Sequence, residues 1–356
     1  MKLFSVSILL LVFVACSSPC HEDGFIIKGR IKGLSDQYLY FDRDFHSDVI
    51  TVKDSFLVKN ERFTLKGKVS EPAELDFYSK DFKTFNGHLI VENTKIRYRS
   101  GIADNASEVV EGSFSNQLFQ QYLTTFDHCY KANDCKLNKQ TQAHLLQHSL
   151  KLVKAYPQHP VSLMGTRHLL KYLNTGQGSA DILQQIVDLL RPAFEGEPEL
   201  KQLQYFANAT ALRQEGSYFI QYKAHLPDGQ SARLSDFYGH GYLFVNCWAS
   251  WCGPCREEYR YFDKVYEKFK ESGFQLVSIS YDSKMSSWQK AIRQDGMEDH
   301  INMSELKSYQ NTISQAYGIN QVPDNFLLDK NGKIIGNNIP AKDLMELMEE
   351  LIGSGK

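Results

Sequence analysis

Hydrophobic and polar residues alternate in short runs between residues 25 and 112 of the 356-residue chain. The runs that fit extended strands are 25–31, 37–41, 49–52, 62–65, 74–78, 89–91 and 96–98. They are rich in β-branched and aromatic residues and are separated by turn-forming residues, which is typical of antiparallel strands with one buried face. We therefore predict an all-β, sandwich-like domain over residues 25–112, and we find no catalytic constellation within it.

From residue 113 to residue 215 the apolar residues recur with a helical period instead. Phe114, Leu118 and Tyr122 stand four residues apart, and the same spacing continues through later segments. Prolines and glycines interrupt the pattern at intervals, as they do between helices. The sequence predicts a helical domain of about four or five helices here.

A third pattern begins near residue 216 and continues to residue 356. Residues 242–248 and 274–280 are nearly continuous apolar runs, the mark of strands buried on both faces. A helical period follows each run, and Asn331-Gly332 supplies the turn of a hairpin. Strands that alternate with helices in this way predict an α/β domain.

The N-terminus carries a short apolar segment of a different kind. Residues 3–14 are almost entirely apolar after Met1-Lys2, and this run is too short to span a bilayer comfortably. We interpret residues 1–15 as a signal peptide. Ala15-Cys16 resembles a bacterial lipobox, although Phe13 replaces the usual Leu, and the resemblance implies a lipidated tether over residues 16–24 that begins at Cys16. Ordinary cleavage to a soluble periplasmic or secreted product is the alternative, and both place the protein outside the cytoplasm.

Composition narrows the classes of partner. The chain is 42% hydrophobic and 23% charged, so it can bury substantial cores and is not a disordered segment. Its formal net charge of −2 gives no basic surface for nucleic acid.

Two clusters contain residues that can bind metals. Cys129 and Cys135 could form a structural disulfide or remain free thiols, and adjacent His128 makes only three candidate ligands. His144 and His148 are four residues apart, but their segment lacks the Glu of the zinc-protease pattern. We expect no metal at either place.

The segment Trp251-Cys252-Gly253-Pro254-Cys255 carries the strongest chemical signal. Two thiols at this spacing can close into a disulfide and can open by attacking another disulfide. The helical period that follows puts Cys252 at a helix N-terminus, where unpaired N–H groups and the helix dipole should lower its pKa to about 7 or lower. Cys252 is therefore the expected attacking thiol and Cys255 the resolving thiol, while Gly253 leaves room for a partner chain and Pro254 suits the first helical turn.

Residues 245–258, VNCWASWCGPCREE, resemble the active-site stretch of thioredoxin-like proteins, and specifically extracytoplasmic thiol–disulfide oxidoreductases of the TlpA/ResA type. A second motif at residues 317–323, YGINQVP, supports the resemblance, which covers residues 216–356. It implies that Pro323 is preceded by a cis peptide bond and packs against the dithiol. It also implies that Val322, together with Trp251, contributes to binding an extended substrate peptide.

Four positions refine this resemblance. Asn246 stands where thioredoxin itself has a buried Asp, and Glu258 matches a Glu of the anchored subfamily. By the resemblance, Glu258 accepts a proton from Cys255 during resolution, although a solvated helix glutamate remains an alternative. Arg260 replaces a proline that usually kinks the active-site helix, and Trp288 would be the core residue of the subfamily's central insertion.

The resulting expectation is an extracytoplasmic thiol–disulfide oxidoreductase that needs no metal or organic cofactor. Its substrates would be protein thiols and disulfides, and a membrane redox partner would restore its dithiol. The Gly-Pro pair favours the reducing direction. The alternative is an envelope binding or sensing lipoprotein whose thioredoxin domain is a scaffold or redox switch, and a peroxidase is a third, weaker possibility.

Overall fold

The computed structural model describes most of the chain beyond the N-terminal segment. The described residues are 24–34, 36–41, 55–81, 83–102, 108–132, 139–170, 173 and 179–353, without the side chains of 127–132 and 139. The signal peptide, lipidation of Cys16, a strand at 49–52 and a bridge between Cys129 and Cys135 therefore lie outside what the structure describes. The chain divides into two compact units, Met1–His128 with His159–Gly165, and Cys129–Gln158 with Thr166–Lys356.

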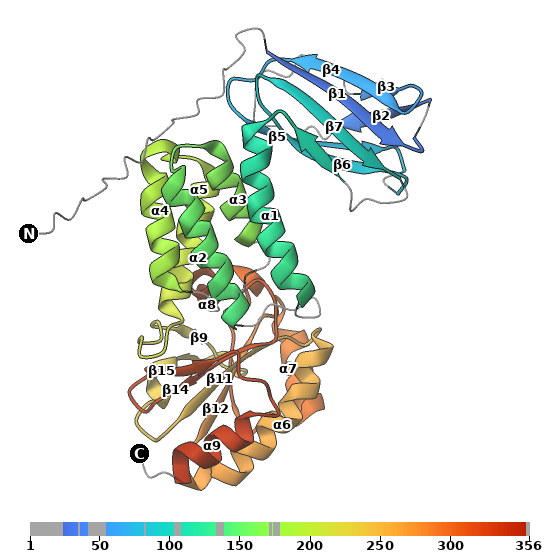
Figure 1. The fold of residues 1–356 in the computed structure, drawn as a ribbon. Coiled ribbons are helices and arrows are strands. Elements are labelled where there is room, and N and C mark those ends of the chain that lie inside the picture. Colours follow the sequence, from blue (N-terminus) through green and yellow to red (C-terminus); the bar gives the residue numbers. More distant parts are fainter. Residues whose placement is uncertain are drawn as a thin grey trace, which may run out of the picture. The chain divides into compact units, whose positions relative to one another are not determined.

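The first unit contains a β-sandwich (Figure 1). Its strands are β1 (Phe25–Lys32), β2 (Gln37–Phe41), β3 (Ser55–Val58), β4 (Arg62–Gly67), β5 (Ala73–Ser79), β6 (Asn86–Val91), β7 (Lys95–Gly101) and β8 (Val109–Glu111). They form two four-stranded sheets, ordered β4-β1-β7-β8 and β3-β2-β5-β6. Aromatic side chains fill the space between the sheets, since the ring of Phe63 lies 4.7 Å from Phe56 and 6.1 Å from Phe77, centroid to centroid. The predicted sandwich is thus present.

One strand pair departs from the antiparallel prediction. β1 runs antiparallel to β4 but parallel to β7, with Ile26 opposite Lys95. The chain builds the second sheet between these two strands, so it returns to β1 by a long connection rather than by a hairpin. Alternation along a single strand cannot reveal which direction its neighbour takes.

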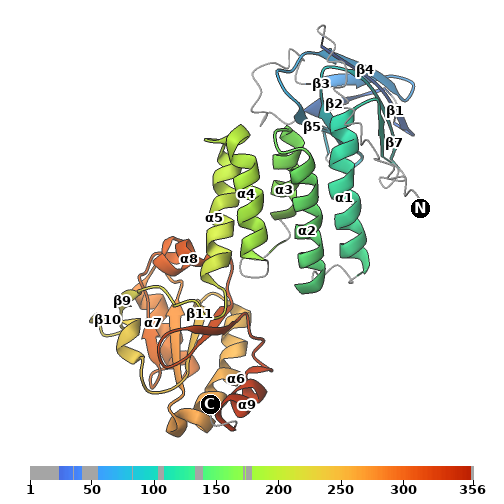
Figure 2. The same ribbon diagram turned by 60° about the vertical axis from the view of Figure 1, so that its left-hand side comes forward.

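Five helices follow the sandwich. They are α1 (Phe114–Ala132), α2 (Lys139–Ala155), α3 (Pro160–Leu170), α4 (Ala180–Phe194) and α5 (Pro198–Leu212). α4 and α5 lie side by side in Figure 2, and Arg191 Nη2 donates to Gln204 Oε1 across them at 2.7 Å. α4 begins where Ser179 Oγ accepts from the backbone N–H of Ile182, and its apolar face is buried. No helix in the described ranges has the length and apolar character needed to cross a bilayer.

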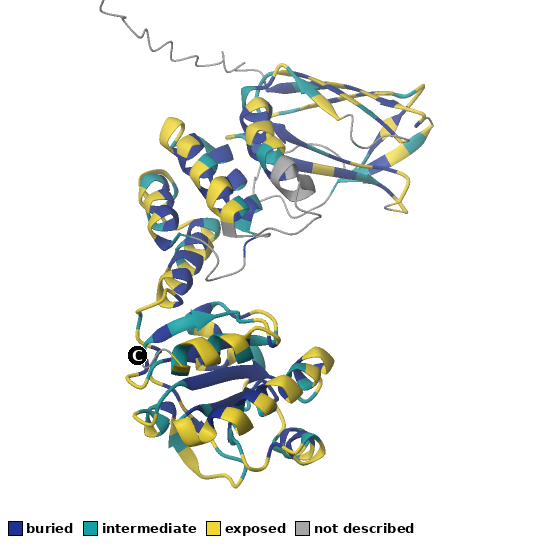
Figure 3. Ribbon diagram, turned by 60° about the horizontal axis from the view of Figure 1, so that its bottom comes forward, coloured by how far each residue is buried: buried dark blue, intermediate teal, exposed yellow. Residues whose placement is uncertain are grey.

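The C-terminal part is an α/β fold around one mixed sheet (Figure 1). Its strands are β11 (Leu243–Trp248), β12 (Gln275–Ser280), β13 (Ile301–Met303), β14 (Asp324–Leu328) and β15 (Ile334–Asn337), and its helices are α6 (Gly253–Phe269), α7 (Met285–Asp295), α8 (Thr312–Tyr317) and α9 (Leu344–Gly353). Two short strands, β9 (Lys223–His225) and β10 (Ser231–Arg233), pair separately before it. The sheet order is β13-β12-β11-β14-β15, with β12 parallel and β14 antiparallel to β11. Every residue of β11 is buried, as its apolar run predicts, and Figure 3 shows the central strands as buried.

The two faces of this sheet are covered by different elements. Phe244 of β11 contacts Phe262 of α6, with ring centroids 4.8 Å apart. Phe326 of β14 contacts Tyr317 of α8 and Phe219, at 4.7 and 5.1 Å. Because side chains alternate along a strand, Asn246 lies on the α6 face with Phe244, whereas Cys247 lies on the opposite face.

Candidate active site

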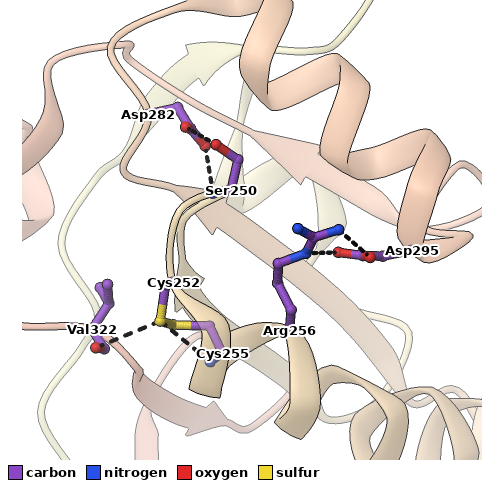
Figure 4. Close-up of a disulfide and its surroundings, with 7 residues drawn as sticks. All are labelled: Ser250, Cys252, Cys255, Arg256, Asp282, Asp295 and Val322. Atoms are coloured by element: carbon purple, nitrogen blue, oxygen red, sulfur yellow. Dashed lines mark hydrogen bonds and ion pairs between the residues drawn. A yellow bond between two sulfur atoms is a disulfide. The ribbon is translucent and has the colours of Figure 1, made fainter.

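The dithiol lies at the N-terminus of α6 (Figure 4). Cys252 is the N-cap residue, and its Sγ accepts from the backbone N–H of Cys255 at 3.2 Å. The two cysteines form a disulfide with their Cα atoms 5.4 Å apart. Both are buried, and Cys255, the third residue of the helix, is the less exposed of the two. The helix N-terminus thus presents its backbone N–H groups at the sulfur that is better placed to meet a substrate.

The backbone of Val322 and Pro323 lies beside Cys252, and we call this segment the cis-proline wall. The Val322-Pro323 peptide bond is cis, as the family resemblance implies. Val322 O lies 3.7 Å from Cys252 Sγ, and Figure 4 shows this carbonyl pointing at the sulfur. The wall and the dithiol come from segments 70 residues apart in the chain. They meet because β14, which begins immediately after Pro323, pairs with β11, which leads to the dithiol.

The surface beside the dithiol is aromatic and open. Trp251 is 58% exposed, and its ring centroid lies 6.3 Å from that of Tyr309. Gly253 and Pro254 are also exposed, and a Cβ at Gly253 would meet nothing within 4 Å. An exposed aromatic side chain beside a reactive disulfide is suited to contact an apolar segment of another protein. Tyr309 was not anticipated from the sequence, because no pattern in it links residue 309 to the dithiol.

A buried carboxylate fixes the loop that precedes the dithiol. Asp282 accepts from the Ser250 backbone N–H at 3.0 Å, from Ser250 Oγ at 2.5 Å and from Ser280 Oγ at 2.8 Å. On the helix side, Arg256 makes a bidentate ion pair with Asp295 of α7 at 2.6 and 2.7 Å. Figure 4 draws the interactions of Asp282 with Ser250 and of Arg256 with Asp295. The sequence could have indicated Asp282, because this residue follows strand β12. β12 runs parallel to β11, and parallel strands end at the same edge of a sheet.

Two polar residues of the family pattern lie close to the dithiol along the chain. Asn246 is on β11, which leads to the dithiol, and Glu258 is on α6, which follows it. Asn246 is buried on the face of the sheet that α6 covers. Glu258 follows Cys255 by one helical turn and is half-buried, whereas neighbouring Glu257 is exposed. Burial raises the pKa of Glu258 above its ordinary value. The environment of Glu258 therefore favours taking up a proton.

Other expected features lie apart from this site. Cys247 is a free, buried thiol, and burial raises its pKa far above the ordinary range. His144 is exposed on α2. Among the described residues, no cluster of three or more His, Cys, Asp or Glu side chains is placed to hold a metal. α6 continues unbroken through Arg260.

Comparison with known proteins identifies two regions. Residues 216–336 match the AhpC/TSA family, and residues 25–119 match a domain of unknown function, DUF4369. Thiol-disulfide oxidoreductase ResA of Bacillus thuringiensis subsp. konkukian (strain 97-27) is 30% identical over 125 residues, covering 35% of this chain and 69% of the relative. ResA of Bacillus subtilis (strain 168) is 26% identical over 121 residues, covering 34% and 65%. The solved thioredoxin domain of a thiol-disulfide oxidoreductase from Bacteroides vulgatus is 29% identical, with a TM-score of 0.37, covering 39% of this chain and 98% of that one.

The fold and the dithiol at its helix N-terminus define the C-terminal region as a thioredoxin-like domain. The chain belongs to the ResA family of thiol-disulfide oxidoreductases. It is accordingly an enzyme of the thiol–disulfide oxidoreductase type.

Proposed function

We propose that this protein is an extracytoplasmic, lipid-anchored oxidoreductase that reduces disulfides of other proteins through Cys252 and Cys255. The arrangement that carries the proposal is the dithiol at the N-terminus of α6, with Val322 O 3.7 Å from Cys252 Sγ. Trp251 and the cis-proline wall would bind an extended segment of the substrate. The anchor at Cys16 rests on the sequence, because that residue lies outside the described part of the chain.

The reaction proceeds through a mixed disulfide. The Cys252 thiolate attacks one sulfur of the substrate disulfide, a bond forms between them, and the other substrate sulfur leaves as a thiolate. Cys255 then loses its proton and attacks Cys252 Sγ, which releases the second substrate thiolate. Two electrons have passed from the dithiol to the substrate, and the Cys252–Cys255 disulfide remains. A membrane dithiol partner would return two electrons for the next cycle.

Insulin reduction by the soluble form that begins at His21 tests this function. With dithiothreitol as electron donor, the protein should accelerate precipitation of the insulin B chain well above the dithiothreitol background. The matched control carries both Cys252→Ser and Cys255→Ser. No acceleration from a protein whose circular dichroism shows an intact fold would contradict the reductase proposal and would support the alternative, a binding or sensing lipoprotein.

Glu258 should control the resolving step rather than the attack. Its carboxylate is the form that accepts the Cys255 proton, so resolution should speed up as pH rises through the raised pKa of Glu258. Glu258→Gln should slow resolution by about a hundredfold and remove that rise. Stopped-flow measurement of mixed-disulfide decay from pH 5 to pH 8 gives the rate.

Glu257→Gln is the matched control, because Glu257 is adjacent but exposed. It should leave both the resolution rate and its pH profile as in the wild type. Equal effects of the two substitutions, or an unchanged profile in Glu258→Gln, would remove Glu258 from the mechanism and leave it a solvated helix residue.

A further inference from the structure

Arg213 is a buried charge that comes from outside the thioredoxin-like domain. It follows α5 as its C-cap residue and precedes the region matched by the AhpC/TSA family, which begins at residue 216. Its side chain is 0% exposed. Among the described residues, Arg213 and Asp282 are the two charged residues that are buried. Asp282 is explained by the active-site loop, whereas Arg213 has no part in the chemistry described so far.

The guanidinium of Arg213 contacts the start of β14. Its Nη2 donates to Asp324 Oδ1 at 2.5 Å, and its Nη1 donates to Tyr317 O at 3.3 Å. Its Cζ also lies 4.6 Å from the ring centroid of Phe326. The backbone carbonyl of Arg213 in turn accepts from Asn337 Nδ2 at 3.0 Å. These contacts hold both the side chain and the backbone of Arg213 against the β14-β15 edge of the sheet.

Asp324 connects this ion pair to the active site. It directly follows Pro323 and is opposite Cys247 in the register of β14 and β11. It shares a sheet face with Phe326, two residues further along, and this is the face that α6 does not cover. Val322 thus contacts the dithiol at the start of α6. Asp324, two residues later, is held by Arg213 on the face of the sheet that α6 does not cover.

We propose that Arg213 is a positioning residue that fixes the cis-proline wall of the active site through its ion pair with Asp324. This inference rests on the proposed function, in which that wall binds the substrate segment. It means that the helical region upstream of the thioredoxin-like domain supplies one residue on which the geometry of the site depends. The Asp324 side chain is 12% exposed, so its carboxylate is largely withdrawn from water and is stabilised as an anion by its partner cation.

The other titratable groups around Asp324 are neutral, so a pH-dependent effect at this place can be assigned to the ion pair. The titratable groups that interact with Asp324 are Arg213 after α5, Cys247 of β11 and Tyr281 after β12. Tyr317 of α8 lies beside this group, since its backbone carbonyl accepts from Arg213. Burial raises the pKa values of the thiol and both phenols far enough to keep them neutral. Arg213 and Asp324 are thus the charged members of this group.

The test compares Arg213→Met, Arg213→Lys and the double variant Arg213→Met/Asp324→Asn in the full chain. Hydrogen exchange of the peptide around residues 318–328 reports how firmly the wall is held, and the rate with a peptide disulfide reports the consequence. Relative to the wild type at pH 8, Arg213→Met should exchange hydrogen faster in this peptide and should react about tenfold more slowly. The exchange and rate ratios should move only part of the way toward one as pH falls to 5.5, because protonation of Asp324 removes the unpaired charge but does not restore the ion pair. Arg213→Lys should rescue partly.

The double variant separates an ion-pair role from simple loss of packing. It lacks the ion pair but leaves no unpaired carboxylate, so its exchange and rate deficits should be smaller than those of Arg213→Met at pH 8 and should not change with pH. Equal deficits in Arg213→Met and the double variant, independent of pH, would overturn the proposal, as would wild-type behaviour of either variant. Hydrogen exchange does not require catalysis, so failure of the wild type to reduce insulin would count against the proposed function while this readout still decides the role of Arg213.

Discussion

We expect Cys252→Ser to lower disulfide exchange to the uncatalysed background, because it removes the sulfur that forms the mixed disulfide. Cys255→Ser should instead preserve the first attack and block resolution. In this variant a covalent complex between Cys252 and the substrate should accumulate, and only an added external thiol should cleave its mixed disulfide. Non-reducing gel electrophoresis followed by mass spectrometry of the trapped species measures both outcomes.

Cys247→Ala is the matched control for these two variants. Cys247 is a free thiol on the same strand-to-helix segment, but it is fully buried and its raised pKa keeps it protonated. It should neither trap substrate nor be needed for exchange. If Cys255→Ser captured no protein in the envelope under several growth conditions, exchange with protein substrates would lose its main support. Capture that persisted after Cys252 was also replaced would contradict the assignment of Cys252 as the attacking thiol.

The large features of the active site could be predicted because local patterns produce them. The continuous apolar run of β11 predicts a strand buried on both faces, and the helical period after Cys252 predicts that α6 starts there. The dithiol therefore sits at the end of a buried strand and at the start of a helix in any fold compatible with these patterns. The cis bond before Pro323 followed from family resemblance, since no spacing rule would have indicated it.

Features set by distant pairing could not be predicted in the same way. The parallel alignment of β1 with β7 depends on how the chain returns after building the other sheet. The ion pair of Arg213 with Asp324 joins residues 111 apart in the chain, and an arginine after a helix is ordinarily solvated. Short elements such as β13 and α8 contain too few residues to show a period. In each case the missing information is long-range contact rather than local preference.

Trp288→Ala should be among the most destabilising single substitutions in the thioredoxin-like domain. Trp288 of α7 is 0% exposed and belongs to the main core of this domain. Removing a buried indole loses its transfer free energy and leaves a cavity, which together cost about 3–5 kcal/mol of unfolding free energy. Single domains have only about 5–15 kcal/mol in total, so the urea midpoint should fall by about a fifth or more. Far-UV circular dichroism measures it without relying on tryptophan fluorescence.

Trp251→Ala provides the same chemical change on the surface. Trp251 is 58% exposed, so its loss should alter the unfolding free energy by no more than about 0.5 kcal/mol. Its effect should appear in catalysis, as a higher KM for protein disulfides with little change for a small disulfide such as oxidised glutathione, because only the larger substrate reaches the exposed ring. Comparable destabilisation by both substitutions would contradict the assigned burial. A KM unchanged for every substrate would remove Trp251 from the binding surface, and substrate contact would then rest on the Val322 backbone and its neighbours.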